Sequence, residues 1–434
     1  MKLKEIRERA VGMGIEKFNA MQEAVAASTA KSLVLLAPTG SGKTLAFATA
    51  VLTRLGTPRD SVMAVILAPS RELAIQIQSV VKPLAKGFKT VVLYGGNSFQ
   101  AETNSIQGGV PQIVIATPGR LLDHINRRTL DISTAHALVV DEYDKTLELG
   151  FQDEVARIVK RIKSVRFVAL TSATPIEAMP AFIHADEAEV INAGDIAQAP
   201  KLTVIEVPSA VPDKLDTLAA LLRSLNGQAM VFVNHRESAE RVVNGLKARN
   251  IDAMLYHGGM EQQRREMAVA AFRAKAAPVL VATDLAARGL DIAGVDSVIH
   301  YHMPVDEQAW THRNGRTARA GASGSVYVIT GPDEATPVFV RVDHPFYPPM
   351  DDTKPVRAEW TLLYINAGKR NKLSKGDIAG FIMKQCGLTA DRVGLITVAL
   401  DYATVAVRPD DAPAVIAAAK QSKLKGVRVR ITEI

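Results

Sequence analysis

The fold of this 434-residue chain is decided by one short stretch, Ala37-Pro38-Thr39-Gly40-Ser41-Gly42-Lys43-Thr44. The stretch follows the apolar run Ser32–Leu36, which has the length and composition of a buried strand, and a helix-like pattern comes after it. Glycines let a backbone curl so that its N–H groups face phosphate oxygens, and the start of a helix adds a favourable dipole. This order therefore predicts a phosphate-binding loop rather than a chance turn.

The side chains at the end of this loop have separate predicted roles. The Lys43 ammonium is expected to reach the β and γ phosphates of a nucleotide, and the Thr44 hydroxyl is expected to ligate Mg²⁺. The loop residues predicted to hold the nucleotide are Thr39, Gly40, Ser41, Gly42, Lys43 and Thr44.

A phosphate loop of this kind needs a carboxylate for the metal at the end of a neighbouring strand. The apolar run Leu138-Val139-Val140 ends in Asp141 and Glu142. We expect Asp141 to hold Mg²⁺, directly or through water, and Glu142 to polarise the attacking water. The alternative is an acidic strand end that binds no metal.

Short apolar runs alternate with helix-like stretches up to about residue 330, and the series occurs twice. Buried parallel strands joined by crossover helices give this pattern, so we predict an α/β fold with two tandem domains. The expected strands are Ser32–Leu36, Val62–Leu67, Ile113–Ile115, Ala137–Val140 and Phe167–Leu170 in the first domain, and Ala229–Val233, Ala277–Ala282, Ser297–Tyr301 and Gly324–Ile329 in the second.

Proline-rich stretches divide the chain. We predict a linker over Ala193–Asp213, and the prolines of Gly331–Pro355 exclude a regular helix or a central strand there. The predicted domains are residues 1–200, 201–335 and 358–434, with a proline-rich linker at 336–357.

The last domain is expected to be a small α+β sandwich with the element order βαββαβ. Its expected elements are strand Trp360–Ala367, helix Lys375–Gln385, strands Gly394–Val398 and Ala403–Val407, helix Pro413–Gln421 and strand Val427–Ile431.

Composition limits the class of protein. A hydrophobic share of 47% excludes a wholly disordered chain, and one cysteine, Cys386, excludes an internal disulfide framework and a cysteine-based zinc cluster. No apolar run approaches the about 20 residues that cross a bilayer, so we expect a soluble, cytoplasmic protein.

Of the net charge of +7, the segment Val356–Ile434 carries +6, from 13 basic and 7 acidic residues. Charge alone leaves a polyanion-binding module and a merely solvated basic surface equally open.

The motifs together resemble the DEAD-box RNA helicases of superfamily 2 over about residues 14–329. The resemblance is carried by the phosphate loop, Asp141-Glu142-Tyr143-Asp144, Ser172-Ala173-Thr174 and His312-Arg313-Asn314-Gly315-Arg316-Thr317-Ala318-Arg319, in this order. It implies two RecA-like domains that bind ATP, Mg²⁺ and RNA. It also implies that Arg316 and Arg319 act as arginine fingers and that Asp291 lies near the ribose and the γ-phosphate. Surface ion pairing is the alternative role for the two arginines.

Further blocks resemble the RNA-contacting motifs of the same family. They are Pro69-Ser70-Arg71-Glu72-Leu73-Ala74, Gly95-Gly96, Thr117-Pro118-Gly119-Arg120, Val231-Phe232-Val233-Asn234, Gln262 with Arg265, and the segment Val281 to Ile292. The residues that the resemblance assigns to RNA are Pro69, Arg71, Gly95, Gly96, Thr117, Arg120 and Thr283.

The chain departs from the family at three places. Tyr143 replaces the alanine that names the family, and Ala318 replaces a glycine. Gln22 matches the glutamine that reads adenine, but the usual proline-threonine-proline and the upstream aromatic residue are absent. A plain helix-surface position is the alternative for Gln22.

From residue 359 onward the chain resembles the RNA-binding domain of DbpA-like helicases, a variant RRM. The residues that carry this resemblance are Leu363-Tyr364-Ile365-Asn366-Ala367-Gly368-Lys369-Arg370, Leu373 and Lys375-Gly376-Asp377-Ile378. It implies an anchor on a hairpin of large-subunit ribosomal RNA, with Lys369, Arg370 and Lys372 on RNA phosphates. For Tyr364 and Tyr402, base stacking and core packing are both open.

The sequence therefore predicts an ATP-dependent RNA helicase. We expect it to bind structured RNA and to open short duplexes locally when ATP closes the two domains, on large-subunit rRNA during ribosome assembly. The expected partners are RNA and pre-ribosomal particles, with no membrane, and the expected state is a monomer. The alternatives are a general RNA-remodelling helicase and a non-catalytic, nucleotide-gated RNA clamp.

Overall fold

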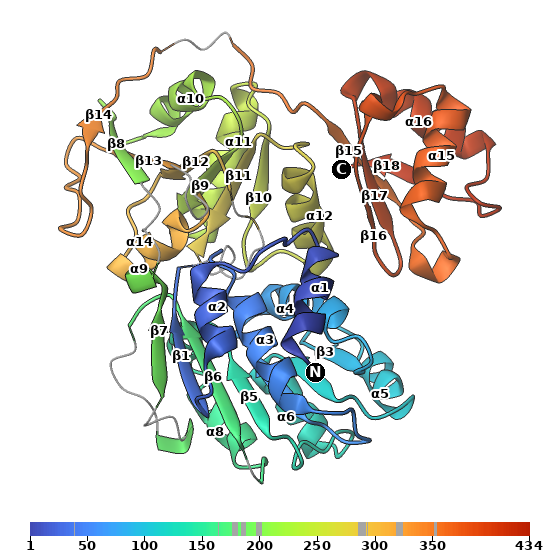
Figure 1. Cartoon of the computed structure of the whole chain (residues 1–434). Helices are drawn as coiled ribbons and strands as arrows, with labels where there is room; N and C mark the ends of the chain where they lie inside the picture. The colour runs from blue at the N-terminus through green and yellow to red at the C-terminus, as the bar shows by residue number, and fades with distance from the viewer. Residues whose placement is uncertain are drawn as a thin grey trace. The chain divides into compact units, whose positions relative to one another are not determined.

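The computed structural model describes residues 1–38, 40–163, 165–175, 181–183, 188–196, 202–284, 292, 294–317, 324–350 and 354–434 (Figure 1). The chain forms two compact units. Unit 1 consists of Met1–Lys201, Arg288–Ala293 and Asp306–Ser323, and unit 2 consists of Leu202–Ala287, Gly294–Val305 and Gly324–Ile434. The segment 306–323 thus belongs to unit 1, although its neighbours along the chain belong to unit 2.

Unit 1 is built on a parallel sheet with the strand order β3-β4-β2-β5-β6-β1-β7. Its strands are β1 (Ser32–Leu36), β2 (Ala64–Leu67), β3 (Thr90–Leu93), β4 (Ile113–Ala116), β5 (Ala137–Val140), β6 (Phe167–Ser172) and β7 (Glu189–Asn192). All five strands expected here are present. The two that the pattern missed, β3 and β7, form the sheet edges and are only partly buried, so their apolar signal is weak.

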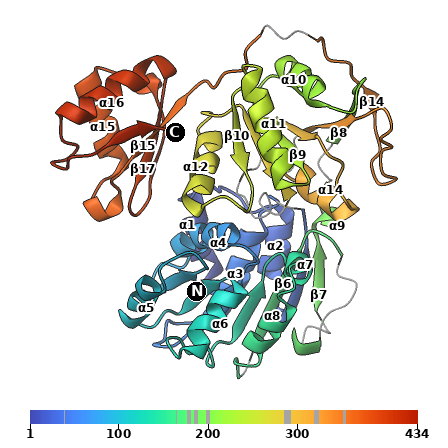
Figure 2. The same ribbon diagram turned by 180° about the vertical axis from the view of Figure 1, so that it is seen from behind.

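Helices cover both faces of this sheet (Figures 1 and 2). They are α1 (Leu3–Val11), α2 (Ala20–Ala27), α3 (Lys43–Leu55), α4 (Arg71–Leu84), α5 (Phe99–Gln107), α6 (Pro118–Asn126), α7 (Tyr143–Glu148), α8 (Gln152–Val159) and α9 (Ala193–Ile196). Helix α14 (Glu307–Asn314) also belongs to unit 1 but is not one of the helices that cover this sheet. One apolar core lies between the sheet and α1 to α4, and a second lies between the sheet and α5 to α8. Burial on both faces explains why the central strands are continuous apolar runs.

The strand order brings the loops of the predicted nucleotide site together. Strand β6 pairs with β1 on one side and with β5 on the other, and all three run in the same direction. Leu36 is in register with Ser172, and Val140 is in register with Leu170. The phosphate loop, the acidic motif and the Ser172 motif therefore emerge at the same edge of the sheet.

Unit 2 contains a second parallel sheet with the order β10-β11-β9-β12-β13-β8-β14. Its strands are β8 (Leu202–Pro208), β9 (Ala229–Val233), β10 (Ala253–Tyr256), β11 (Val279–Thr283), β12 (Ser297–His300), β13 (Gly324–Thr330) and β14 (His344–Pro345). Helices α10 (Leu215–Ser224) and α11 (Arg236–Ala248) share one apolar core with the sheet, and α12 (Gln262–Arg273) packs on β10 and β11.

Strand β8 corrects the prediction of a linker over Ala193–Asp213. Residues 202–208 pair along their whole length with β13, and Val207 is fully buried. The prolines concealed this strand, but Pro208 is its last residue, where a missing N–H is tolerated. Among its described residues, the proline-rich segment after β13 contributes the two-residue edge strand β14 and no central strand, which agrees with the prediction.

The C-terminal domain has the expected βαββαβ order. Its elements are β15 (Thr361–Ile365), α15 (Lys375–Cys386), β16 (Val393–Val398), β17 (Ala403–Val407), α16 (Ala412–Gln421) and β18 (Ile431–Glu433), with an antiparallel sheet in the order β16-β17-β15-β18. The last strand begins at Ile431 instead of the predicted Val427, because Ile431 is the first residue that pairs with β15. Val427 instead pairs with Leu424 across a tight turn at Lys425 and Gly426, both of which have positive φ.

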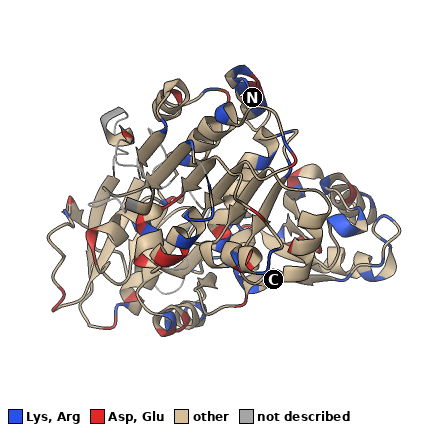
Figure 3. Cartoon of the chain, turned by 90° about the horizontal axis from the view of Figure 1, so that it is seen from below, with Lys and Arg blue, Asp and Glu red and all other residues tan. Residues whose placement is uncertain are grey.

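Positions of Lys, Arg, Asp and Glu are spread along the ribbon, on helices of both units and in the C-terminal domain (Figure 3). Amphipathic helices of this kind bury one face and expose the other. Among the helices of the described residues, none has the length and apolar character needed to cross a membrane.

Candidate nucleotide and RNA site

The phosphate loop is held in a shape that only glycine permits at one position. Gly42 precedes α3 with φ +87°, and a Cβ there would clash with Nε2 of Gln22. Lys43 is 8% exposed, and its ammonium donates to the carbonyls of Ala37 and of Pro38, the latter at 3.1 Å. The lysine therefore lies folded over the loop in which phosphate is predicted to bind.

Gln22 is a buried part of this loop. It is 6% exposed, and its Nε2 donates to the Gly42 carbonyl at 3.2 Å. Its Oε1 accepts from the Asn19 backbone, while Asn19 caps α2 and donates from Nδ2 to the Ser41 carbonyl at 2.9 Å. Gln22 is therefore not an exposed residue on the surface of its helix. Its role in adenine recognition stays a prediction.

Two buried carboxylates follow β5. Asp141 is 3% exposed and Glu142 is 5% exposed. The Thr171 hydroxyl donates to Asp141 Oδ1 and accepts from the Glu142 backbone N–H at 3.1 Å. Glu142 has φ 47°, an uncommon conformation for a residue with a side chain, and such strain is often found at functional sites. Burial raises the pKa of both carboxyl groups above its ordinary value, and the charge of Asp141 raises the pKa of Glu142 further.

The same group of residues determines the protonation of Lys43. Burial lowers the pKa of its ammonium, whereas the charges of Asp141, Glu142 and Asp144 oppose that shift. The donor set suits Mg²⁺, which prefers carboxylate and hydroxyl oxygens. Asp141 at the end of β5 and Thr44 in the first turn of α3 supply one of each.

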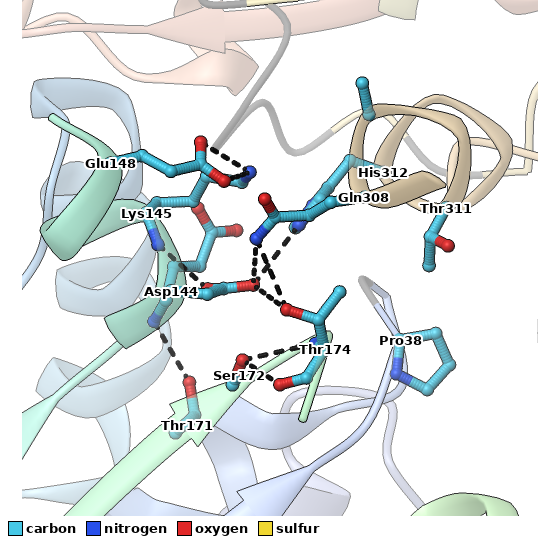
Figure 4. Close-up of polar contacts among 12 residues, drawn as sticks. Pro38, Asp144, Lys145, Glu148, Thr171, Ser172, Thr174, Gln308, Thr311 and His312 are labelled. Carbon is cyan, nitrogen blue, oxygen red and sulfur yellow. Dashed lines mark hydrogen bonds and ion pairs between the residues drawn. The ribbon is translucent and has the colours of Figure 1, made fainter. Parts of the chain in front are cut away.

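Asp144 is the centre of a polar cluster within unit 1 (Figure 4). Its Oδ2 accepts from Gln308 Nε2 at 3.2 Å and from the Thr174 hydroxyl at 3.1 Å, and it lies 3.4 Å from Nε2 of His312. Ser172 in turn bonds the Thr174 backbone N–H at 3.2 Å. Burial alone would raise the Asp144 pKa, but the contacts with His312 and Gln308 and the Lys145 charge lower it well below its ordinary value. Burial lowers the pKa of His312, and its contact with Asp144 opposes that shift.

The first predicted arginine finger reaches this site. Arg316 is 1% exposed, and its positive charge acts on both Lys43 and Glu142. Three other predicted site residues, Thr39, Asp291 and Arg319, lie outside the residues that the structure describes.

The predicted RNA residues of unit 1 follow neighbouring strands. Pro69 and Arg71 come after β2, Gly95 and Gly96 after β3, and Thr117 and Arg120 after β4, and these strands are adjacent in the sheet. Gly96 has φ +95°, and the Arg71 guanidinium lies so close that a Cβ would sit 2.5 Å from its Nη1. The structure therefore brings these six residues to one edge of the sheet.

Glu102, a buried residue that the sequence interpretation missed, supports the sheet edge that carries these six predicted RNA residues, which we call the RNA edge. Glu102 on α5 is 4% exposed and accepts from Arg120 Nε at 2.7 Å, from His124 Nε2 at 3.0 Å and from Asn97 Nδ2 at 3.2 Å. Burial would raise its pKa, but the bonds from His124 and Arg120 lower it. Glu102 thereby fixes Arg120 relative to the glycine loop. Its only signal in the sequence is a carboxylate on a helix between two RNA motifs.

In unit 2, the predicted RNA residue Thr283 ends β11 and is 7% exposed. Gln262 and Arg265 lie on α12, three residues apart, so they share one side of the helix. Most of the motif that follows Thr283 lies outside the described residues.

Tyr143, the departure from the family at the acidic motif, is a core residue. It is 1% exposed and belongs to the same apolar core as Val140, Val155, Ile158 and Leu170. Burial raises the pKa of its hydroxyl to about 12. It therefore points into the apolar layer beneath α7 rather than into the nucleotide site.

The basic loop of the C-terminal domain, residues 368–372, is fixed through its backbone. A Cβ on Gly368 would lie 2.5 Å from the Ala399 carbonyl, so only glycine fits against the turn between β16 and β17. The Lys369 and Arg370 N–H groups donate to carbonyls of this turn at 2.9 Å each. The Arg370 guanidinium pairs with Asp401 at 2.7 Å, and the side chains of Lys369, Arg370 and Lys372 are exposed.

The two tyrosines of the C-terminal sheet are half-buried rather than core residues. Tyr364 and Tyr402 stack on each other with ring centroids 5.7 Å apart. Within unit 2 the Tyr402 hydroxyl donates to Glu266 Oε2 at 2.7 Å. Base stacking by these rings stays a prediction.

Comparisons with known proteins agree with this arrangement. Residues 19–181 match the DEAD/DEAH box helicase family, residues 213–321 match the helicase conserved C-terminal domain, and residues 362–433 match the DbpA RNA binding domain. The chain therefore belongs to the DEAD-box family of ATP-dependent RNA helicases. More narrowly, it is similar to the ATP-dependent RNA helicase DbpA of Escherichia coli strain K12, with 32% identity over 425 residues that cover 92% of this chain and 90% of that protein.

Solved structures share the fold of the helicase core. S. cerevisiae Dbp5 bound to RNA and ADP BeF3 aligns with a TM-score of 0.67 and 25% identity over 76% of this chain and 88% of that one. Mss116p bound to ssRNA and AMP-PNP aligns with a TM-score of 0.66 and 25% identity over 80% of this chain and 77% of that one. The predicted family, the fold class with two RecA-like domains, and the enzyme class of RNA-dependent ATPase and helicase are confirmed.

Proposed function

We propose that this helicase acts on large-subunit ribosomal RNA during ribosome assembly, with its C-terminal domain as the anchor. The observation that carries the proposal is the match of residues 362–433 to the DbpA RNA binding domain, on a chain similar to DbpA along 92% of its length. The exposed basic loop on a rigid backbone gives that domain a surface suited to RNA phosphates. Pre-ribosomal particles as partners, a monomeric state and a cytoplasmic location are parts of the same proposal.

In the proposed cycle, ATP and RNA together close the two RecA-like domains and bend one strand of a short duplex. The Lys43 ammonium exchanges the carbonyls of Ala37 and Pro38 for phosphate oxygens. Glu142, whose pKa is raised by burial, orients and polarises the attacking water. Arg316 stabilises the negative charge that phosphoryl transfer spreads over the phosphate oxygens, and Arg319 is assigned the same role by resemblance.

The proposal gives the remaining site residues supporting roles. Asp141 and Thr44 would hold Mg²⁺, which when bound neutralises phosphate charge. Asp144 joins the Thr174 motif to Gln308 and His312 through direct contacts, so a change at the nucleotide can alter the segment that bears Arg316.

The test is the ATPase rate of the full chain with no RNA, with an unrelated structured RNA and with a large-subunit rRNA fragment. We expect the rRNA fragment to stimulate at lower concentration than the unrelated RNA. Replacing the loop cations (K369Q/R370Q/K372Q) should raise the rRNA concentration for half-maximal stimulation about tenfold, because three phosphate contacts are lost.

The matched control is the double variant K384Q/K420Q, which removes exposed cations from α15 and α16 of the same domain. It should leave the rRNA preference intact. Equal stimulation of the wild-type chain by both RNAs would exclude the rRNA anchor and favour a general RNA-remodelling helicase.

A further inference from the structure

A basic pocket lies at the edge of the unit 1 sheet opposite to the nucleotide site. It has a volume of about 500 Å³ and is lined by residues at the start of β1, β5 and β6 and at the end of α3. The catalytic loops follow the other ends of β1 and β5. Because β1 has five residues at about 3.3 Å each, roughly 16 Å of strand separates the two sites.

The lining of this pocket is strongly cationic. Lys31, Arg54, Arg59, His136 and Arg166 contribute to it, and none of the described residues that line it is Asp or Glu. Lys31, Arg59 and Arg166 are exposed, and no ion pair joins any of the three to a carboxylate within the described residues. The pKa of His136 is lowered mainly by burial and further by the positive charges of Arg166 and Arg59.

Hydrogen bonds hold the backbone around the pocket in place. The Arg166 N–H donates to the His136 carbonyl at 2.8 Å, and Gln112 Nε2 donates to the Arg59 carbonyl at 2.8 Å. The Lys31 carbonyl accepts from the Val168 N–H at 2.8 Å. Three of the cationic positions are therefore anchored to the sheet edge, and only their side chains can adjust to a ligand.

Arg54 forms part of the wall of the pocket and is not one of the groups that we expect to bind a ligand. Its guanidinium donates to the carbonyls of Ser28 at 2.8 Å and of Ala50 at 3.0 Å, and it lies 4.4 Å from the centroid of the Phe167 ring. Glu189 supports the charge of Arg54 from outside the pocket lining. Because Phe167 is 2% exposed and Arg54 covers one face of its ring, this ring is not free to stack on a base.

We propose that this pocket binds the phosphate groups of a multiply charged ligand, without reading a base. Arginine pairs with phosphate oxygens through two parallel hydrogen bonds, and Arg59 and Arg166 are the groups placed to do so. The volume suits a ligand of nucleotide size. The phosphates come either from a free polyphosphate or from an RNA segment beyond the helicase site, and both sources share this chemistry.

The experiment measures binding of tripolyphosphate to the full chain by titration calorimetry in saturating ADP, which occupies the catalytic loop. We expect one site in the wild-type chain and about tenfold weaker binding in R59Q/R166Q, since each exposed arginine–phosphate contact contributes little more than an exposed ion pair. The control K82Q/K160Q removes two exposed cations elsewhere in unit 1 and should bind as the wild type does. Absence of binding to the wild type, or equal binding by all three proteins, would overturn the proposal.

A second arm identifies the source of the phosphates. Single-stranded RNA is titrated at several salt concentrations into the wild type and R59Q/R166Q. If RNA is the source, the variant binds more weakly, its salt dependence is smaller by about two counterions, and tripolyphosphate competes with RNA. If a free polyphosphate is the source, the RNA affinity of the two proteins is equal while the calorimetric difference persists. Thermal melts of both variants check that the fold is intact.

Discussion

The nucleotide site of unit 1 and the basic loop of the C-terminal domain hold their functional groups in opposite ways. At the nucleotide site the charged side chains are themselves buried: Lys43, Asp141, Glu142 and Arg316 are all at most 8% exposed. In the basic loop the charged side chains are exposed, and the backbone beneath them is fixed by hydrogen bonds to a neighbouring turn. The first site should therefore fail when one buried side chain is changed, whereas the second should be weakened both by loss of its cations and by loss of its backbone support.

The largest effect is expected at Glu142. Replacing it by glutamine (Glu142→Gln) keeps its size but removes the group that polarises water, so kcat should fall by about 10²–10⁴-fold. The measurement is the steady-state ATPase rate at saturating RNA, together with RNA binding in ATP, which should persist. Glu154→Gln on α8 is the control and should turn over normally. Normal turnover by Glu142→Gln would contradict the proposed base.

Next in size is the loss of the buried support of the RNA edge. Glu102→Ala leaves Arg120 and His124 without their carboxylate, and breaking a buried pair lowers the free energy of unfolding by about 3–5 kcal/mol. Chemical denaturation measures this loss, and the RNA concentration for half-maximal ATPase stimulation should rise. Glu102→Gln, which keeps acceptor oxygen but not charge, should lose less of both.

The same glutamate gives a pH dependence with a defined sign. Because the folded state lowers the Glu102 pKa below its ordinary 4.5, its contribution to stability is present above that pH and is lost as the pH falls further. Wild-type stability measured between pH 6 and pH 3 should fall more steeply than that of Glu102→Gln. If the stabilities of the two proteins fell equally with pH, the Glu102 charge would not contribute to this hydrogen-bond network.

Glu102 also shows what the sequence could and could not predict. The phosphate loop and the acidic motif could be predicted because each combines residue types and spacing that phosphate chemistry requires, whereas the role of the arginine motif is implied only by the resemblance to the family. Glu102 belongs to no such spacing, since its partners Asn97, Arg120 and His124 meet it only through the packing of α5 on α6 and the glycine loop. Contacts of this kind follow from tertiary structure and leave no local pattern.

The fold shows the same division. Central strands were predicted because burial on both faces makes them continuous apolar runs. Strand β8 was mistaken for a linker because the prolines around it carry a stronger local signal than its alternating residues, which are stabilised by pairing with β13. Edge strands β3 and β7 were missed because partial exposure weakens their apolar pattern.

A moderate effect is expected when the backbone of the basic loop is disturbed. Gly368→Ala places a methyl group against the Ala399 carbonyl, and such overpacking costs about 1–3 kcal/mol. It should weaken rRNA binding although no cation is removed, whereas Gly376→Ala on α15 has space for its methyl group and should not. The measurement is rRNA affinity with thermal denaturation of both variants. Unchanged rRNA binding by Gly368→Ala would show that loop geometry does not matter.

A smaller change, of opposite sign, is expected at Tyr143. Its hydroxyl is buried and has no hydrogen-bond partner among the described residues. Tyr143→Phe removes this polar group from the apolar layer and should raise the free energy of unfolding by about 1 kcal/mol without altering the ATPase rate. Chemical denaturation checks the first point and a steady-state assay the second. A loss of stability would reveal a partner for the hydroxyl.

The smallest effect is expected at Asp377, which lies beside the basic loop and is half-buried. It accepts from the Ser374 N–H at 2.8 Å and from Lys425 Nζ at 2.9 Å, and Lys425 also donates to the Lys372 carbonyl at 2.8 Å. These bonds lower the Asp377 pKa to about 2. The link from Asp377 through Lys425 to the loop is therefore kept at mildly acidic pH and is lost only as the pH falls toward that value. Asp377→Asn should slightly weaken rRNA binding at pH 7 by freeing Lys425 and the end of the loop. Because water screens this pair, an effect as large as that of Gly368→Ala would mean that exposed charges, rather than the backbone, determine the geometry of the loop.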